Sequence, residues 1–288
     1  MASQQQLKSR IRSVKSTKQI TKAMQMVAAS KMRRAQDATK ATTPYTNTAR
    51  KILSHLARQG ATQGHPLFEV RTVKKRLVIV IASDKGLAGA YNSNVGKLYI
   101  KELLADDKAG IKTATISVGR KASQLAARLK NDEILGAYEN LPDKLQGNEM
   151  QAALDTAFKL YSSEDIDAVD VIFTEFINGI KQLAKVERLL PAGAALDESA
   201  GDVDESLFEP DTETVLQNVV YRLLGAQMFQ ALLDARASEH SMRMIAMKNA
   251  TDNAGDLVDD LTLAMNKARQ AEVTQELAEI SGGAEAMK

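Results

Sequence analysis

The sequence lacks cysteine and tryptophan, and its other aromatic residues are few, with six Phe and six Tyr in 288 positions. Without Cys the chain has no disulfide framework and no thiol chemistry, which suits a reducing compartment. The many Ala, Leu, Met and charged residues favour extended helices over a compact all-β fold. No apolar run approaches the roughly 18 to 20 residues of a membrane-spanning helix, and the polar start lacks the pattern of a secretory signal. We therefore expect a soluble, cytoplasmic chain that meets a membrane only through a partner.

Residues that could carry out catalysis or hold a metal are equally scarce. The three histidines, His55, His65 and His240, have no metal-ligand spacing, and there is no Cys to complete a site. His240 stands beside Glu239 on a helix face that the pattern predicts to be polar and solvated. The sequence offers no pair of nucleophile and base. We predict no catalytic residue, no cofactor and no metal site.

One segment, Ser83 to Ala90 (SDKGLAGA), is rich in glycine and follows an apolar stretch. A Gly-rich turn between a strand and a helix is where phosphates often bind. The segment matches neither G-x-G-x-x-G nor G-x-x-x-x-G-K-[ST], however. A tight strand-to-helix turn is the favoured interpretation, and phosphate binding is the alternative.

Charge is segregated between the two ends of the chain. The first 36 residues carry nine cations and no carboxylate, whereas the stretch from Asp252 to Glu279 is mostly acidic. Oppositely charged helices at the two ends can pair antiparallel, which makes everything between them an insertion at one end of a rod. The nine cations are Lys8, Arg10, Arg12, Lys15, Lys18, Lys22, Lys31, Arg33 and Arg34.

The N-terminal helix is predicted over residues 1–58. Leu7, Ile11 and Val14 begin a narrow apolar seam, which resumes after a phase shift at Ile20, Met24 and Val27. Pro44 predicts a bend or break, because proline removes a backbone donor and clashes with the preceding turn.

The C-terminal helix is predicted over residues 212–283, with Thr212 as its cap. Its apolar positions step by four and three, as in a coiled coil, with one stutter near residues 247–253. Because Ala and Met dominate this seam, the pair buries little area and is weak for its length. The predicted seam positions are Leu224, Met228, Ala231, Ala235, Ser238, Met242 and Ile245, then Ala254, Leu257, Leu261, Ala264, Ala268, Ala271, Gln275 and Ala278.

The centre, residues 75–191, predicts a Rossmann-like α/β domain. Four strands are expected, at residues 77–82, 111–118, 169–176 and 186–190, and the last two are close enough to form an antiparallel hairpin at one edge of the sheet. Helices are expected at residues 93–105, 121–130 and 149–161. An acidic loop, residues 192–211, follows. The fold class is therefore α/β, with a long antiparallel coiled coil of the terminal helices.

Several segments resemble the gamma subunit of F-type ATP synthases. Lys18 to Gln36 (KQITKAMQMVAASKMRRAQ) is similar to that family's N-terminal helix, and Met247 to Ile280 to its C-terminal signature. Ser83 to Val95 resembles its first strand-turn segment. Gly119-Arg-Lys121 and Phe208-Glu-Pro-Asp211 also match. Ala88 departs from the family, in which many members have Cys.

The resemblance implies a central rotor that carries no catalytic residue of its own. Its terminal helices are expected to turn inside a ring of three alpha and three beta subunits, and its central domain to contact the epsilon subunit and the ring of c subunits. Such a chain is peripheral, at the cytoplasmic face of the cell membrane as part of the complex. The residues implied to contact the catalytic subunits are Met24, Arg243, Arg269, Gln270, Thr274 and Glu276, and those facing the c ring are Phe208 and Glu209.

Two other functions remain as alternatives at this point. The basic N-terminal helix could bind nucleic acid or serve a coiled-coil scaffold, although it has no interleaved aromatics and no DNA-binding motif. The Gly-rich turn could belong to a nucleotide-binding α/β enzyme. The absence of a phosphate-binding motif and the family resemblance favour the rotor, with no nucleic-acid partner.

Overall fold

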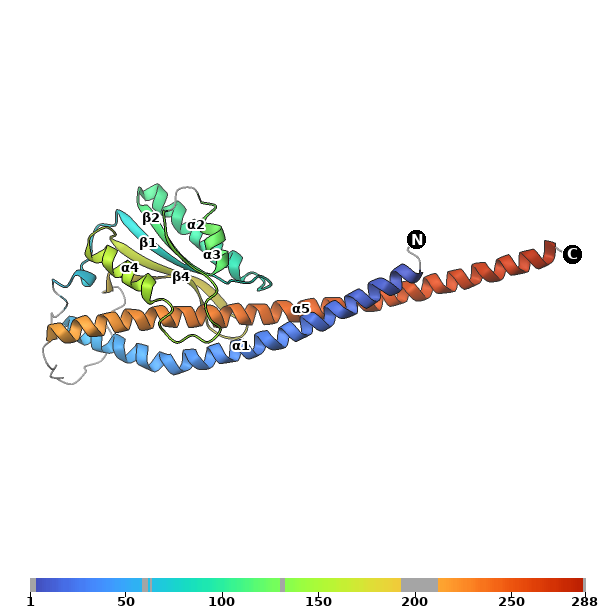
Figure 1. Cartoon of the computed structure of the whole chain (residues 1–288), viewed down its shortest axis with the longest axis horizontal. Helices are drawn as coiled ribbons and strands as arrows, with labels where there is room; N and C mark the ends of the chain where they lie inside the picture. The colour runs from blue at the N-terminus through green and yellow to red at the C-terminus, as the bar shows by residue number, and fades with distance from the viewer. Residues whose placement is uncertain (1–3, 59–61, 63, 130–132, 193–211, 287–288) are drawn as a thin grey trace. The chain divides into compact units, whose positions relative to one another are not determined.

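The computed structural model describes the whole chain except residues 1–3, 59–61, 63, 130–132, 193–211 and 287–288 (Figure 1). The chain forms two compact units. Unit 1 joins residues 1–29 to residues 243–288, and unit 2 spans residues 30–242. Two long helices, α1 (Gln4–Arg58) and α5 (Thr212–Ala286), each contribute to both units.

Unit 1 is an antiparallel pair of helices. Thr21 of α1 is hydrogen-bonded to Thr251 of α5, and a Cβ built on Gly255 would meet the end of the Lys18 side chain. Residue numbers thus fall along α5 as they rise along α1. This confirms the predicted pairing of the chain's two ends.

The seam of this pair differs from the predicted one. Ile20 and Val27 are more than half exposed, at 57 and 56 %, and Leu257 is 47 % exposed. The side chains buried instead continue the heptad of Leu7 without a phase shift. The apolar pattern selected the large residues Ile20 and Val27, but Thr21 and Ala28, one position later, are buried instead. The reason is that small side chains let two helices approach closely. The buried positions are Leu7, Ile11, Thr21 and Ala28 on α1 and Met247, Thr251 and Ala254 on α5.

Pro44 predicts a bend or a break, and of these two the break is wrong, because α1 continues through Pro44. Proline removes only one hydrogen bond of the ladder, and contact with α5 holds this stretch of α1 in place. The Thr42 hydroxyl donates to the Gln230 side chain of α5 at 2.7 Å, which ties this stretch of α1 to its neighbour. The Thr43 hydroxyl donates to the Thr39 carbonyl in the preceding turn at 2.7 Å.

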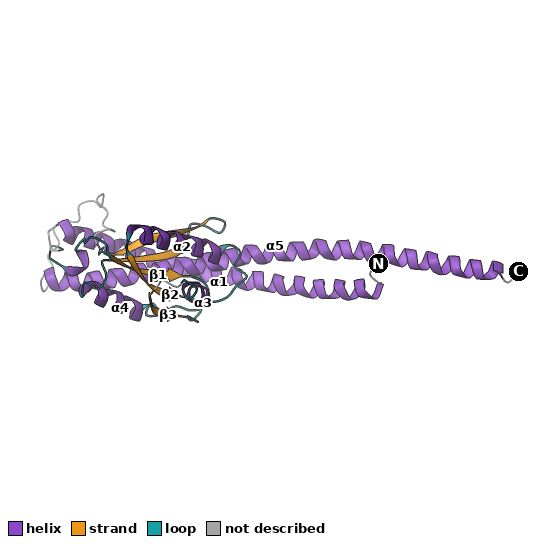
Figure 2. Cartoon of the chain, turned by 90° about the horizontal axis from the view of Figure 1, so that it is seen from above, coloured by secondary structure: helices purple, strands orange, loops and turns teal. Residues whose placement is uncertain are grey.

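Unit 2 contains a five-stranded sheet with the order β3-β2-β1-β4-β5. Its strands are orange in Figure 2. The first four strands in this order are parallel and β5 is antiparallel to β4, which confirms the predicted edge hairpin. The sequence pattern missed β3, because its mixture of apolar, charged and glycine residues suits a half-exposed edge and not a buried strand. The strands are β1 (Lys75–Ile81), β2 (Lys112–Val118), β3 (Glu133–Tyr138), β4 (Ala168–Phe176) and β5 (Gln182–Leu190).

Helices cover both faces of the sheet. Helices α2 (Tyr91–Ala109) and α3 (Arg120–Ala126) pack on one face, and α4 (Gln151–Ser162) packs on the other together with the unit 2 parts of α1 and α5 (Figure 1). A short 3-10 turn, η1 (Pro66–Phe68), precedes β1. Alternate residues of β1 point to the two faces, so Val78 and Val80 join the α2 side while Ile79 and Ile81 join the α5 side.

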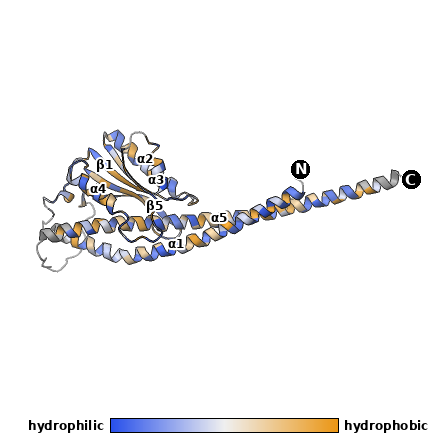
Figure 3. Cartoon of the chain, in the orientation of Figure 1, coloured by the Kyte–Doolittle hydropathy of each residue, from blue (hydrophilic) through white to orange (hydrophobic). Residues whose placement is uncertain are grey.

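The larger core lies on the α5 side. It joins Leu53 of α1 and Leu154 of α4 to a continuous series of α5 side chains between Leu216 and Ala235. The apolar strands are the orange arrows in Figure 3, between helices of mixed hydropathy. Among the described residues, no helix has both the length and the apolar character needed to cross a bilayer.

Candidate functional site

The six residues predicted to contact catalytic subunits all belong to unit 1, where they lie at two levels. Met24 is half-buried on α1, and Arg243 is buried on α5. Because Thr21 faces Thr251, Met24 lies at the level of Met247, about one helical turn from Arg243. The other four, Arg269, Gln270, Thr274 and Glu276, are exposed.

The exposed group lies near the end of α5, where few side chains of this chain cover it. All the described side chains of α5 from Arg269 to Ser281 are exposed, including the large apolar Val273, Leu277 and Ile280. On α1, Ile20, Met26 and Val27 are likewise more than half exposed. Apolar side chains in water at this density mark a surface that another molecule covers.

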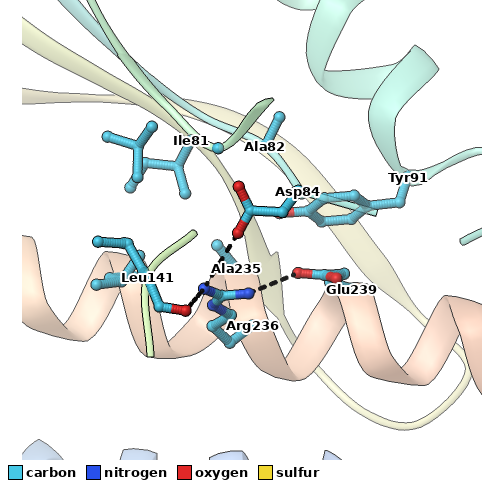
Figure 4. Close-up of a pocket in the computed structure, with 11 residues that line it drawn as sticks. Ile81, Ala82, Asp84, Tyr91, Leu141, Ala235, Arg236 and Glu239 are labelled. Atoms are coloured by element: carbon cyan, nitrogen blue, oxygen red, sulfur yellow. Dashed lines mark hydrogen bonds and ion pairs between the residues drawn. The ribbon is translucent and has the colours of Figure 1, made fainter. Parts of the chain in front are cut away.

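A second group of polar residues joins α5 to the carboxyl ends of the sheet strands, within unit 2 (Figure 4). The Asp84 carboxylate accepts hydrogen bonds from the backbone N–H of Arg120 at 3.1 Å and of Asn140 at 3.0 Å. Its second oxygen faces Arg236 of α5 at 3.8 Å. Arg236 also pairs with Glu239 at 3.4 Å and donates to the Leu141 carbonyl at 3.3 Å. One carboxylate thus connects three loops of the sheet domain to α5.

The Gly-rich segment is a turn that bonds to itself. Ser83 donates from its backbone to Asn92 at 3.1 Å and from its hydroxyl to the Lys85 carbonyl at 2.7 Å. At the end of the adjacent strand β2, the backbone of Gly119 packs closely against Ala82. Gly119 has φ +88°, and a Cβ there would come within 2.2 Å of the Ala82 carbonyl oxygen. The first N–H of α3, where a phosphate could bind, holds the chain's own Asp84 carboxylate instead.

Comparison with known proteins identifies the family. The model of the ATP synthase family named ATP-synt matches residues 3–287. The ATP synthase gamma chains of Xylella fastidiosa (strain M12) and Stenotrophomonas maltophilia (strain R551-3) are each 39 % identical to this chain over 288 residues, the full length of both partners. The chain belongs to the ATP synthase gamma-chain family.

Solved structures of the family have the same fold. The central stalk of the Tetrahymena thermophila mitochondrial ATP synthase is 26 % identical, with a TM-score of 0.60 over 80 % of this chain and 99 % of that one. The rotor of the Euglena gracilis enzyme matches with a TM-score of 0.63 over 93 % of this chain and 97 % of that one, at 18 % identity, which supports the fold alone.

The prediction for His240 is wrong, and the residues predicted to face the c ring lie outside the described part of the chain. His240 and Glu239 are buried, at 8 and 3 % exposure, and not solvated, because the α5 stretch around them packs inside unit 2. The two residues predicted to face the c ring, Phe208 and Glu209, lie outside the described residues, as does the acidic loop from residue 193. His65 accepts a hydrogen bond from the Leu67 N–H at the start of η1, a capping role.

A polar cavity of about 180 Å³, which no sequence pattern predicted, lies between α1, the β4–β5 hairpin and α5. Asp234 lines it with Glu175, Lys185 and Glu187. Burial, assisted by the nearby Glu175 charge, raises the pKa of Asp234 to about 6. Lys185 bridges Glu175 at 2.9 Å and Glu187 at 3.0 Å, so two of the three carboxylates are directly neutralised. These residues are far apart in the sequence, and only the folded sheet brings them together.

Proposed function

We propose that the chain is the central rotor shaft of an F-type ATP synthase. It couples ion flow through the membrane c ring to ATP synthesis, or hydrolysis, in the alpha and beta subunits, and it contributes no catalytic site of its own. The observation that carries this proposal is the full-length match to gamma chains, at 39 % identity with no part of either chain left over.

The geometry of unit 1 supports a shaft. A pair of helices with large apolar side chains exposed on both members buries them only when other subunits surround it. The angle of an asymmetric shaft can bias each surrounding catalytic site toward a different state, because the contacts differ from one site to the next. The energy of ion flow reaches ATP through these differential contacts.

The partners follow from the same assignment. Alpha and beta subunits surround the helical pair, and the α/β domain contacts the epsilon subunit and the c ring. Met24 and Arg243 serve one level of contact with the catalytic subunits. Arg269, Gln270, Thr274 and Glu276 serve a second, and Phe208 and Glu209 face the c ring.

We assign four segments to these roles: an N-terminal coiled-coil helix at residues 1–58, the central α/β domain at 75–191, an acidic loop at 192–211 and a C-terminal coiled-coil helix at 212–283. The complex holds the chain as a peripheral subunit at the cytoplasmic face of the cell membrane.

Co-purification tests the proposal directly. The affinity-tagged chain, expressed in its own cells, should emerge with one copy for every three alpha and three beta subunits, and with ATPase activity that the isolated chain lacks. Recovery of the tagged chain without alpha and beta subunits would contradict the rotor assignment.

A further inference from the structure

Two threonine hydroxyls meet in the buried seam of unit 1. Thr21 of α1 and Thr251 of α5 are hydrogen-bonded at 2.8 Å, and both side chains are more than nine-tenths buried. We call this contact the threonine bridge. It is a hydrogen bond between side chains 230 positions apart in the sequence.

The seam around the bridge is made mostly of small residues, with Met247 as the one large buried side chain beside Thr251 on α5. Ala28 and Ala254 are the nearest buried neighbours of the bridge along the two helices, and Gly255 has no side chain at all. Small side chains bury little area, so packing contributes little free energy to this part of the seam. A directional contact between the two helices adds to what packing contributes to their register.

The bridge is not required to satisfy either hydroxyl. The Thr251 hydroxyl lies 2.8 Å from the Met247 carbonyl, and the Thr21 hydroxyl lies 3.0 Å from the Lys18 carbonyl. Each threonine therefore has an acceptor in its own helix, and loss of the bridge leaves no buried hydroxyl without a partner. The bridge instead depends on geometry, because it forms only when the two helices keep one axial and rotational alignment. A polar seam residue specifies the register of a coiled coil for the same reason.

We propose that Thr21 and Thr251 are positioning residues, which hold α1 and α5 in one register when the shaft is under torque. This proposal rests on the proposed rotor function. While the bridge is intact, the two helices turn as one body. Without it, each helix shifts against the other when the load rises, and part of the rotation no longer reaches the catalytic subunits.

The test uses the assembled complex in membrane vesicles and measures ions pumped per ATP hydrolysed. Thr21→Val, Thr251→Val and the double variant replace each hydroxyl by a methyl group of nearly the same size. A matched control, Thr17→Val with Thr262→Val, removes one hydroxyl from each helix where each bonds the preceding turn of its own helix, to Ser13 at 3.1 Å and to Val258 at 2.7 Å. The pair Thr21→Ser with Thr251→Ser keeps both hydroxyls.

We expect each valine variant to lower the ratio of ions to ATP at least twofold. The double variant should lose no more than either single one, because all three remove the same bond. The serine pair and the control pair should keep the wild-type ratio. An unchanged ratio in the double valine variant, or an equal loss in the control pair, would overturn the inference while leaving the rotor assignment intact. A wild-type chain that does not enter the complex would instead refute the rotor assignment.

A second measurement tests the same proposal even if the valine variants assemble poorly. Thr21→Cys with Thr251→Cys places two thiols at the bridge in a chain that has no other Cys. Oxidation should form a disulfide that restores the wild-type ratio, and reduction should lower it at least twofold in the same preparation. Equal ratios in the two redox states would show that the bridge does not hold the register.

Discussion

At the residue scale, Asp84 has several partners for a single carboxylate. It holds the N–H groups of Arg120 and Asn140 and faces Arg236 of α5. An acidic residue after the first strand therefore serves to fasten the sheet domain to a helix, within the segment for which a tight turn was the favoured interpretation and phosphate binding the alternative.

Replacing Asp84 tests this role. Asp84→Ala leaves two N–H groups without their acceptor and removes a charge facing Arg236, so we expect the free energy of unfolding to fall by about 2 to 4 kcal/mol. Asp84→Asn keeps an acceptor oxygen and should lose about half as much. Denaturant unfolding of the chain measures both. Equal losses in the two variants would show that the backbone hydrogen bonds contribute nothing.

Asp234 makes the stability depend on pH. Its pKa in the folded chain, about 6, lies above the ordinary 3.8, because burial disfavours the charged form. Ionising Asp234 therefore costs more free energy in the folded chain than in the unfolded chain. This free-energy cost is absent below about pH 4 and complete above about pH 6, so the free energy of unfolding falls as pH rises through this window. The cost is about 2 kcal/mol after allowance for partial exposure of the cavity.

Asp234→Asn should remove this cost. We expect the variant to be more stable than the wild type at pH 7.5, by about 2 kcal/mol, and equally stable at pH 4. Thermal unfolding at several pH values measures the difference, with the exposed Asp256→Asn as the control that should show no such pH dependence. A difference between Asp234→Asn and wild type that is the same at both pH values would contradict the account.

At the scale of elements, the sequence predicted both long helices, four of the five strands and the edge hairpin, because continuous apolar runs and long heptads are local signals. It failed where the outcome depends on tertiary contacts. Ile20 and Val27 satisfied the apolar pattern, yet Thr21 and Ala28 occupy the seam, since the close approach of two helices selects small side chains. Pro44 predicted a bend or a break, yet α1 is continuous there, and Thr42 bonds Gln230 of α5 beside it.

The candidate site likewise has a part that could be predicted from the sequence and a part that only the folded chain shows. The six residues predicted to contact the catalytic subunits came from the family resemblance, because an exposed Arg269 or Gln270 carries no local signal that separates a contact from solvated surface. The Asp84 contacts and the Asp234 cavity join residues distant in sequence, so only the folded chain shows them. The threonine bridge was hidden because the predicted seam of α1 took Ile20 where Thr21 is buried, and because Thr251 lies within the predicted stutter of α5.

At the scale of the whole molecule, each of the helices α1 and α5 contributes residues to both units. Unit 2 is a doubly covered sheet domain with a large core, and unit 1 is a thin pair of helices with exposed apolar side chains. A chain whose two halves are joined in this way can transmit rotation, provided that its helices turn together and that the surrounding subunits do not turn with them.

Cross-linking in the assembled complex tests this central claim most directly. Gln270→Cys, paired with a Cys in the facing part of a beta subunit, should on oxidation reduce ATP hydrolysis to near zero, and reduction should restore it, because the bond stops the shaft. The internal disulfide of Thr21→Cys with Thr251→Cys should leave hydrolysis intact, because both helices belong to one turning body. ATP hydrolysis that continues unchanged with the chain bonded to a beta subunit would contradict the account of a rotating shaft.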